Sequence, residues 1–424
     1  MATEASRATD RRSIALLSVG HLFVDISQGA VPALLPFLIA ERGYSYTAAG
    51  GLVLASTISS SLIQPLFGHF SDRRSLPWLM PAGVALAGLG ISLAGLAPTY
   101  LLTFLAIVLS GLGVAAFHPE GSRFANYVSG SRRASGMSLF AVGGNAGVAL
   151  GPVLFTPAVL VFGLSGTLVF IVPFALMAIV LGAGLGHLRG FRPDARETAQ
   201  EREIPPAWGP FVRLSGVITF RTFVYFGLVT FVPLYFIREL GASPGAANAA
   251  LALLLFGGAA GTLLGGPLAD RVGTRPVLIG SMALVGPLVL AFWASGQALA
   301  TALVFVVGAA LIATFSVTLV MGQEYLPGRI GIASGVMLGL AIGLGGVGAP
   351  LFGAVADRFG LSVTMLVLAA LPIPGALLAL SLPREPRPAT PDERGELAAM
   401  TDRATVDLLQ RLDAEERAEG RAKW

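Results

Sequence analysis

The stretch GHFSDR at residues 68–73 returns as GPLADR at residues 266–271, which is 198 residues further along the chain. Both copies follow the pattern GxxxDR, and each follows a long apolar run. A second short segment, ASG, occurs at residues 134–136 and again at residues 333–335, a separation of 199 residues. Two repeats with nearly the same spacing predict that the apolar part of the chain consists of two copies of one helical unit.

The composition indicates that lipid surrounds most of the chain. Hydrophobic residues make up 54% of the 424 positions and charged residues only 12%, whereas about a quarter of the residues of a soluble domain are charged. Ten of the 24 Asp and Glu residues follow Pro383, so the rest of the chain has too few charges to cover a large water-facing surface. The chain has no Cys, which excludes disulfides and thiolate metal sites.

Apolar runs long enough to cross a hydrocarbon layer of ~30 Å recur between short breaks marked by Pro, Gly or charge. The runs are too long and too uniformly apolar for the alternating strands of a barrel. We therefore expect an all-α membrane protein with twelve transmembrane helices in two pseudo-symmetric six-helix bundles. The expected spans are 13–40, 46–70, 78–97, 99–128, 134–163, 164–187, 213–238, 245–270, 276–295, 297–324, 329–354 and 361–382.

Arginine placement predicts the orientation. With the N-terminus inside, fifteen arginines before the tail fall on the cytoplasmic side and three on the other, so both termini are expected in the cytoplasm. The same asymmetry explains the basic balance without a nucleic-acid partner. The expected divisions are a cytoplasmic N-terminus (1–12), an N-terminal bundle (13–187), a linker (188–212), a C-terminal bundle (213–382) and a cytoplasmic tail (383–424). The tail is either one amphipathic helix or a solvated, partly disordered terminus.

The GxxxDR copies carry candidate gating residues: Asp72 and Arg73 in the first, Asp270 and Arg271 in the second. At a helix end, an Asp can accept backbone N–H groups or pair with an Arg of the neighbouring bundle when that side of the protein is closed. The alternative is an ordinary helix-end charge that sets topology. Occurrence at matching positions in both halves favours the latch.

Acidic residues at membrane depth are costly and usually serve a pathway or a partner. His21, Asp25 and Gln28 stand at i, i+4 and i+7 and so share one helical face. Asp25 lies about 18 Å into its span by helix rise, near the midplane. Burial there disfavours the charged form, so Asp25 is a candidate proton carrier. Substrate contact and a structural hydrogen bond remain alternatives, and Gln28 is a candidate substrate contact.

The segment FHPEGSR at residues 117–123 supplies further candidates. Glu120 and Arg123 stand three residues apart on one helical face and are expected to pair. The pair is either a static clip or a switch in which protonation of Glu120 frees Arg123 for an anion. We include His118 and Glu120 with Asp25 as candidate proton-coupling residues. A metal site built from His118 and Glu120 is not expected, because their spacing does not bring both ligands together.

Three polar residues in other spans complete the set. Asn145 lies among small residues, where an amide serves either as interhelical glue or as a ligand contact. Arg221 lies about 12 Å into its span, where it either attracts an anionic substrate or extends to the headgroups. Glu324 lies near the end of its span and is a further candidate for a carboxylate within the bilayer.

Several segments together resemble the fosmidomycin-resistance family of the major facilitator superfamily. They are HLFVD at 21–25, QG at 28–29, PALLP at 32–36, FHPEGSR at 117–123, VGGN at 142–145, GP at 151–152, QEYLP at 323–327 and ASG at 333–335. The likeness covers nearly all of residues 13–382. It implies export of small toxic molecules, typically phosphonate antibiotics such as fosmidomycin, driven by inward proton flow in a bacterial inner membrane.

We therefore expect a proton-coupled efflux antiporter that needs no cofactor other than protons and acts as a monomer in the lipid bilayer. A proton-coupled importer of a small organic anion is the alternative within transporters. A passive channel or a sensor is the alternative from another class. An intramembrane enzyme is not expected, because the sequence offers no HExxH motif, no GxSxG motif in a suitable setting and no Cys.

Overall fold

The computed structural model describes residues 9–64, 66–67, 76–130, 133–191, 206–326, 333, 336–337 and 341–383. Within these residues every regular element is helical, which confirms the expected fold class. Eight helical stretches in this part are long and apolar enough to cross a membrane, and Leu79–Ala94 is a shorter apolar helix. The first GxxxDR copy and the cytoplasmic tail, on which several expectations rested, lie outside the described residues.

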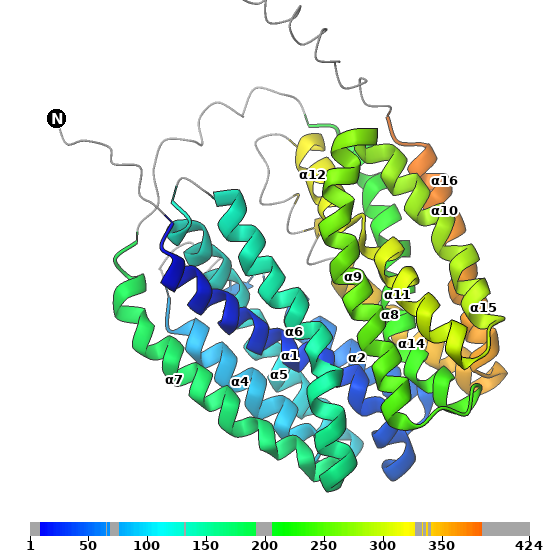
Figure 1. Ribbon diagram of the computed structural model, residues 1–424, viewed down its shortest axis with the longest axis horizontal. Helices are drawn as coiled ribbons and strands as arrows, with labels where there is room; N and C mark the ends of the chain where they lie inside the picture. The colour runs from blue at the N-terminus through cyan, green and yellow to red at the C-terminus, as the bar shows by residue number, and fades with distance from the viewer. Residues whose placement is uncertain are drawn as a thin grey trace, which may run out of the picture. The chain divides into compact units, whose positions relative to one another are not determined.

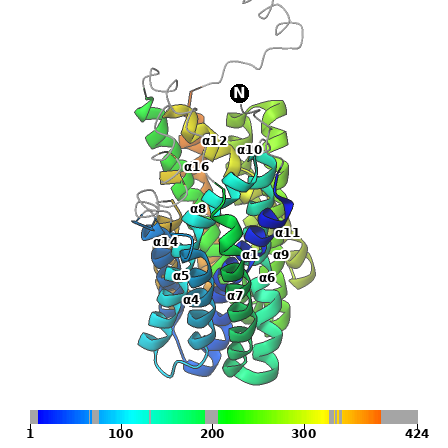
Figure 2. The same ribbon diagram turned by 90° about the vertical axis from the view of Figure 1, so that its left-hand side faces the viewer.

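The N-terminal half consists of helices that run up to residue 188 (Figure 1). They are α1 (Arg11–Arg42), α2 (Tyr46–Thr57), η1 (Ile58–Leu62), α4 (Leu79–Ala94), α5 (Tyr100–Val128), α6 (Arg133–Phe162), η2 (Gly163–Phe170) and α7 (Ile171–Leu188). Helix α4 packs against both α5 and α7 (Figure 2), and α1 packs against α6. The element η1 is a π-helical turn, and η2 is a 3₁₀ helix.

The C-terminal half follows from residue 208. It consists of α8 (Trp208–Arg238), α9 (Pro244–Val272), α10 (Thr274–Trp293), α11 (Gln297–Ile312), α12 (Phe315–Tyr325), α14 (Ala341–Phe359), α15 (Leu361–Ala370) and α16 (Pro372–Leu380). Helix α8 packs against α9, α14, α15 and α16, and α9 packs against α11. The buried apolar residues form two clusters, each made almost entirely of side chains from one half.

Polar residues at the helix starts explain where several helices begin. Asp10 caps α1, Ser45 caps α2, Thr99 caps α5 and Ser243 caps α9, each through a side-chain oxygen that accepts a backbone N–H. Such caps satisfy N–H groups that have no partner within the helix. Gly43 ends α1 with a φ of 65°, a left-handed conformation that glycine adopts without steric cost.

Two expected spans are interrupted. The span expected at 297–324 divides into α11 and α12 at Thr314, and the span expected at 361–382 divides at Leu371, directly before Pro372. Proline lacks the N–H that a continuing helix needs, which explains the second break. In the span expected at 46–70, the π-helical turn carries three buried serines. Ser59 and Ser60 donate hydrogen bonds to carbonyl oxygens of the preceding turn.

The two halves meet where α2 packs against α14 and α6 packs against α9 (Figure 1). The α2–α14 contact is close enough to require glycine. A Cβ atom at Gly50 would clash with the carbonyl oxygen of Ala349, and one at Gly353 would clash with the carbonyl oxygen of Tyr46. The backbones of the two halves therefore touch directly at this end of the helices.

Candidate functional site

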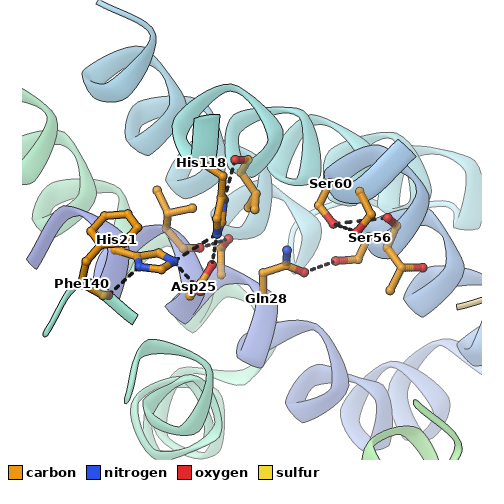
Figure 3. Close-up of polar contacts among 12 residues, drawn as sticks. His21, Asp25, Gln28, Ser56, Ser60, His118 and Phe140 are labelled. Carbon is orange, nitrogen blue, oxygen red and sulfur yellow. Dashed lines mark hydrogen bonds and ion pairs between the residues drawn. The ribbon is translucent and has the colours of Figure 1, made fainter. Parts of the chain in front are cut away.

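The polar cluster nearest the middle of the N-terminal half brings together His21 and Asp25 of α1 with His118 of α5 (Figure 3). His21 Nε2 lies 3.2 Å from Asp25 Oδ2, and His118 Nε2 lies 3.5 Å from Asp25 Oδ1. The two imidazole Nε2 atoms are 3.1 Å apart. Asp25 therefore faces two histidines, one from its own helix and one from a position 93 residues later in the chain.

The tautomers of the two histidines follow from their other ring nitrogens. His21 Nδ1 lies 2.8 Å from the carbonyl oxygen of Phe140, and His118 Nδ1 lies 2.9 Å from that of Val114. A carbonyl oxygen only accepts, so both Nδ1 atoms must carry the hydrogen. When both rings are neutral, each Nε2 presents a lone pair to the other and to the carboxylate. Three acceptors converge, and a proton or another cation between them is needed to relieve their repulsion.

Aromatic rings and a glycine shape the space around this cluster. The His21 ring stacks on Phe140 with ring centroids 4.1 Å apart. A Cβ atom at Gly144 of α6 would stand 2.5 Å from His21 Nε2 and 2.7 Å from Asp25 Oδ2. Gly144 is thus the residue that leaves room for the cluster. Its neighbour Gly143 instead permits close backbone packing against Ser18.

Gln28 lies next to the cluster on the same face of α1, as the spacing predicts. Its Oε1 accepts a hydrogen bond of 3.1 Å from the hydroxyl of Ser56 on α2 (Figure 3). Asn145, by contrast, is exposed on α6 and is not part of the cluster. It makes no interhelical hydrogen bond within the part of the chain that the structure describes.

Glu120 follows His118 by only two residues but serves a different contact. Its side chain is fully buried, and Oε1 accepts a hydrogen bond of 2.7 Å from the backbone N–H of Leu76, just before α4. Arg123 Nη1 lies 3.7 Å from the same oxygen, so the ion pair expected from their spacing is present. The second carboxylate oxygen of Glu120 is buried and has no hydrogen-bond partner among the described residues. Glu120 thus ties α5 to the start of α4.

Arg221 is a buried cation of the C-terminal half, with a residue exposure of 3%. Its Nη1 donates to the hydroxyls of Thr314 and Thr318 at 3.1 and 3.2 Å, and its guanidinium lies 5.8 Å from the centre of the Phe315 ring. These contacts hold the side chain inside the protein rather than at the headgroups.

The remaining sequence candidates lie apart from this cluster. Asp270 and Arg271 are exposed at the end of α9, and no ion pair between them occurs among the described residues. Glu324 is exposed in the last turn of α12. Asp72 and Arg73 belong to the stretch outside the described residues.

A third GxxxDR copy, GAVADR at residues 353–358, makes a contact that our sequence analysis did not predict. Asp357 at the end of α14 accepts hydrogen bonds from the backbone N–H groups of Tyr46 and Thr47, both at 2.9 Å, and from the Thr47 hydroxyl at 2.6 Å. A carboxylate of one half therefore caps the first turn of α2 in the other half. The signal was available, because the pattern is identical to the two copies that define the repeat.

A second missed contact between the halves is made by Asn248 of α9. Its amide nitrogen donates to the carbonyl oxygen of Ala33 on α1 and to the hydroxyl of Thr156 on α6, both at 2.9 Å. Asn248 is 1% exposed and lies among small apolar residues. A lone amide in an apolar helix was its only sequence signal.

Comparisons with known proteins agree with this architecture. A family model described as the Major Facilitator Superfamily matches residues 17–337 and 214–412. The chain is 33% identical over 392 residues to the fosmidomycin resistance protein of Escherichia coli strain K12, which covers 89% of this chain and 95% of that protein. It is 32% identical over 378 residues to the uncharacterized MFS-type transporter YfnC of Bacillus subtilis strain 168, covering 87% of this chain and 92% of that protein.

A solved structure shares the fold. The inward-facing, unoccupied structure of a bacterial homologue of the human lysosomal transporter Spinster superposes with a TM-score of 0.74 at 18% identity, covering 89% of this chain and 97% of that chain. Together with the identity to full-length relatives, these matches place the chain among transporters rather than enzymes. The chain belongs to the fosmidomycin-resistance family of the major facilitator superfamily and is a multi-pass membrane transporter.

Proposed function

We propose that this chain is a proton-coupled efflux antiporter that exports a small toxic molecule such as fosmidomycin or a related phosphonate. The identity of 33% to the fosmidomycin resistance protein supports the direction and the substrate class. The observation that carries the coupling is the convergence of three acceptor groups, His21 Nε2, His118 Nε2 and the Asp25 carboxylate, whose nearest atoms lie 3.1 to 3.5 Å apart. That arrangement favours one proton held in common.

The contacts between the halves support alternating access. Asp357 and Asn248 join the halves at the end of the helices where α1 ends and α2 begins. With both termini in the cytoplasm of a bacterial inner membrane, as the arginine asymmetry predicts, this end faces the periplasm. In that orientation the structure is closed toward the periplasm. Opening this end requires the Asp357 and Asn248 contacts to break.

Exchange requires that the proton and the substrate exclude one another. Without its proton, the cluster offers acceptors that a hydrogen-bond-donating group of the substrate can occupy in place of the proton. Arg221 in the opposite half supplies the charge for an anionic group of the same molecule. Gln28, Arg123 and Asn145 remain proposed substrate contacts. Glu120, whose carboxylate is tied to the start of α4, is proposed as a second proton-sensitive group.

The lipid bilayer and one small-molecule substrate are the partners that this proposal needs. We propose a monomer as the working unit, because each chain contains both halves of the repeat and so the whole alternating-access unit. No nucleic acid and no organic cofactor enter the proposed cycle.

The decisive experiment uses the purified protein in proteoliposomes and follows fosmidomycin-dependent proton movement with a pH-sensitive dye. Fosmidomycin moving one way is expected to drive protons the other way, and Asp25→Asn is expected to abolish the coupled proton flux. Glu41→Gln, which removes an exposed carboxylate in the last turn of α1, is the matched control and is expected to retain it. Protons and drug moving in the same direction would instead establish the importer, and drug flux indifferent to a collapsed proton gradient would establish a channel.

A further inference from the structure

The nitrogen and oxygen atoms of the His21, Asp25 and His118 cluster are spaced like the ligands of a metal ion. A tetrahedral ion with ligand distances of about 2.0–2.1 Å places neighbouring ligand atoms about 3.3–3.4 Å apart. The two Nε2 atoms are 3.1 Å apart, His21 Nε2 lies 3.2 Å from Asp25 Oδ2, and His118 Nε2 lies 3.5 Å from Asp25 Oδ1, so the carboxylate turns one oxygen toward each histidine. With one ligand atom taken from each residue, the three atoms lie within 4.8 Å of one another. We propose that this cluster binds one divalent transition-metal ion, with Zn²⁺ as the ion that its ligand set fits best.

The histidines are already oriented as metal ligands. Metal-binding histidines almost always donate the other ring N–H to a carbonyl or a carboxylate, which fixes the tautomer and aims the free nitrogen at the ion. Both rings meet this condition, since His21 donates to Phe140 and His118 donates to Val114. Chance proximity of two histidines would not fix both tautomers with both Nε2 atoms directed at one carboxylate.

The cluster is partly accessible and leaves a coordination position free. The side chain of His118 is 23% exposed, whereas those of His21 and Asp25 are 10% and 12% exposed. Among the described residues, no fourth His or acidic side chain joins the three. Three protein ligands with an open fourth position are typical of zinc sites that exchange a water or a ligand. Gly144 keeps the space beside His21 Nε2 and Asp25 free of a side chain.

Charge also favours a divalent ion. Two neutral imidazoles and one carboxylate carry a net charge of −1. Among the described residues, no arginine or lysine side chain contacts them. A divalent ion satisfies all three acceptors at once. Resting on the proposed function, the consequence is that Zn²⁺ occupies the place of the coupling proton and blocks transport, so that the metal acts as an inhibitor of the transporter.

Binding is tested with Zn²⁺ alone on the purified full-length chain in detergent, free of any histidine tag, by isothermal titration calorimetry. We expect one ion per chain and, with Co²⁺ as a spectroscopic substitute, visible absorption bands of a low-coordinate site. His21→Ala, His118→Ala and Asp25→Ala are each expected to weaken binding by ~10-fold or more. His187→Ala is the matched control, because His187 also pairs with an aspartate, Asp10, but outside this cluster.

Two results would overturn the metal site: no saturable Zn²⁺ binding to the folded wild type, or unchanged binding in the double variant His21→Ala/His118→Ala. Size-exclusion chromatography establishes that each variant is folded, and His21→Gln and His118→Gln replace any alanine variant that aggregates. The transport arm separates the two proposals. Zinc binding without proton-coupled drug flux would support the metal site and refute the antiporter proposal. Coupled flux in a protein that binds no zinc would support the antiporter proposal and refute the metal site.

Discussion

Gly144 is the residue on which the geometry of the candidate site depends most directly. A methyl group there would stand 2.5 Å from His21 Nε2, which is closer than real Cβ atoms approach a heavy atom, so His21 or α6 must shift. We expect Gly144→Ala to reduce drug-driven proton flux by ~10-fold or more, since small displacements at a reacting site have effects of that size.

The control for this prediction is Gly182→Ala in α7, where an added Cβ meets nothing within 4 Å. Flux is measured in proteoliposomes, with thermal unfolding of both variants as the stability readout. Wild-type flux in the Gly144→Ala protein would show that the close packing beside His21 has no part in transport.

Sequence named the three residues of this cluster as candidates but did not predict which candidates meet, for a physical reason. The depth of Asp25 and its i, i+4 spacing from His21 required only helix geometry. The contact of His118 with Asp25 depends on how α5 packs beside α1, and helix spacing within one segment does not predict that packing. Neighbouring positions on α5 also point in different directions, so Glu120 contacts Leu76 while His118 turns to Asp25. That divergence is why considering His118 together with Glu120 did not reveal the contact between His118 and Asp25.

At the scale of single elements, Asp357 joins the C-terminal end of α14 to the N-terminal end of α2, against which α14 packs. A carboxylate at a helix N-terminus contributes roughly 1 kcal/mol through the N–H groups and the helix dipole. We expect Asp357→Asn to shift the population away from the closed arrangement by about fivefold. Because the chain has no native Cys, the shift is measured by the alkylation rate of a single Cys at Ala149, which is buried between the halves.

Arg358→Gln is the matched control for Asp357→Asn, since Arg358 is the other half of the DR pair and contacts the Phe359 ring rather than α2. Equal labelling rates in Asp357→Asn and the wild type would show that Asp357 does not hold the two halves in the closed arrangement.

The N-terminal end of α1 carries a pH-dependent contact. The hydrogen bond from His187 lowers the pKa of Asp10 to about 2, with further contributions from Ser13 and Arg12. A carboxyl group whose pKa is depressed by folding stabilises the fold above its unfolded value of 3.8, and that contribution is lost as the pH falls toward 2. We expect Asp10→Asn to melt at a lower temperature than the wild type at pH 7.

The difference in melting temperature between Asp10→Asn and the wild type should shrink steadily as the pH is lowered from about 4 toward 2, because Asp10 takes up a proton near pH 3.8 in the unfolded chain and only near pH 2 in the folded protein. A difference that stays constant down to the lowest pH at which the protein remains folded would contradict this assignment. Thermal unfolding in detergent across a pH series provides the measurement.

Elements were easier to predict than their interruptions. Long apolar runs and the GxxxDR repeat were sufficient to predict an all-helical protein made of two related halves. The break at Thr314 left no such signal, because no proline or glycine marks it and the hydropathy is continuous. Pro372 did provide a signal for the second break, but the apolar run continues through it, so hydropathy alone predicts one unbroken span. The expected division of the chain at 188–212 and at 383 stays a prediction.

For the whole molecule, the two halves are held by a small number of polar contacts beside the glycine packing of α2 on α14. Asn248 supplies two of these hydrogen bonds, each contributing about 1 kcal/mol. We expect Asn248→Ala to shift the balance between the closed and open arrangements by about ten- to thirtyfold. The same Cys at Ala149 reports the shift as faster alkylation.

Thr262→Ala is the control for Asn248→Ala, because Thr262 lies on the same helix but donates only to Gly258 within α9. If Asn248→Ala left labelling unchanged while lowering the unfolding temperature, Asn248 would serve the stability of each half and not the balance between them.

The cap of α2 by Asp357 also makes the two sides of the latch unequal in their tolerance of mutation. Asp357 takes two of its three hydrogen bonds from backbone N–H groups, which every residue except proline provides. A substitution at Tyr46 should therefore leave this cap in place unless proline is introduced, whereas nearly any substitution at Asp357 should remove it. As far as this contact is concerned, the sequence of α2 is therefore free to vary, whereas the aspartate at the end of α14 is constrained.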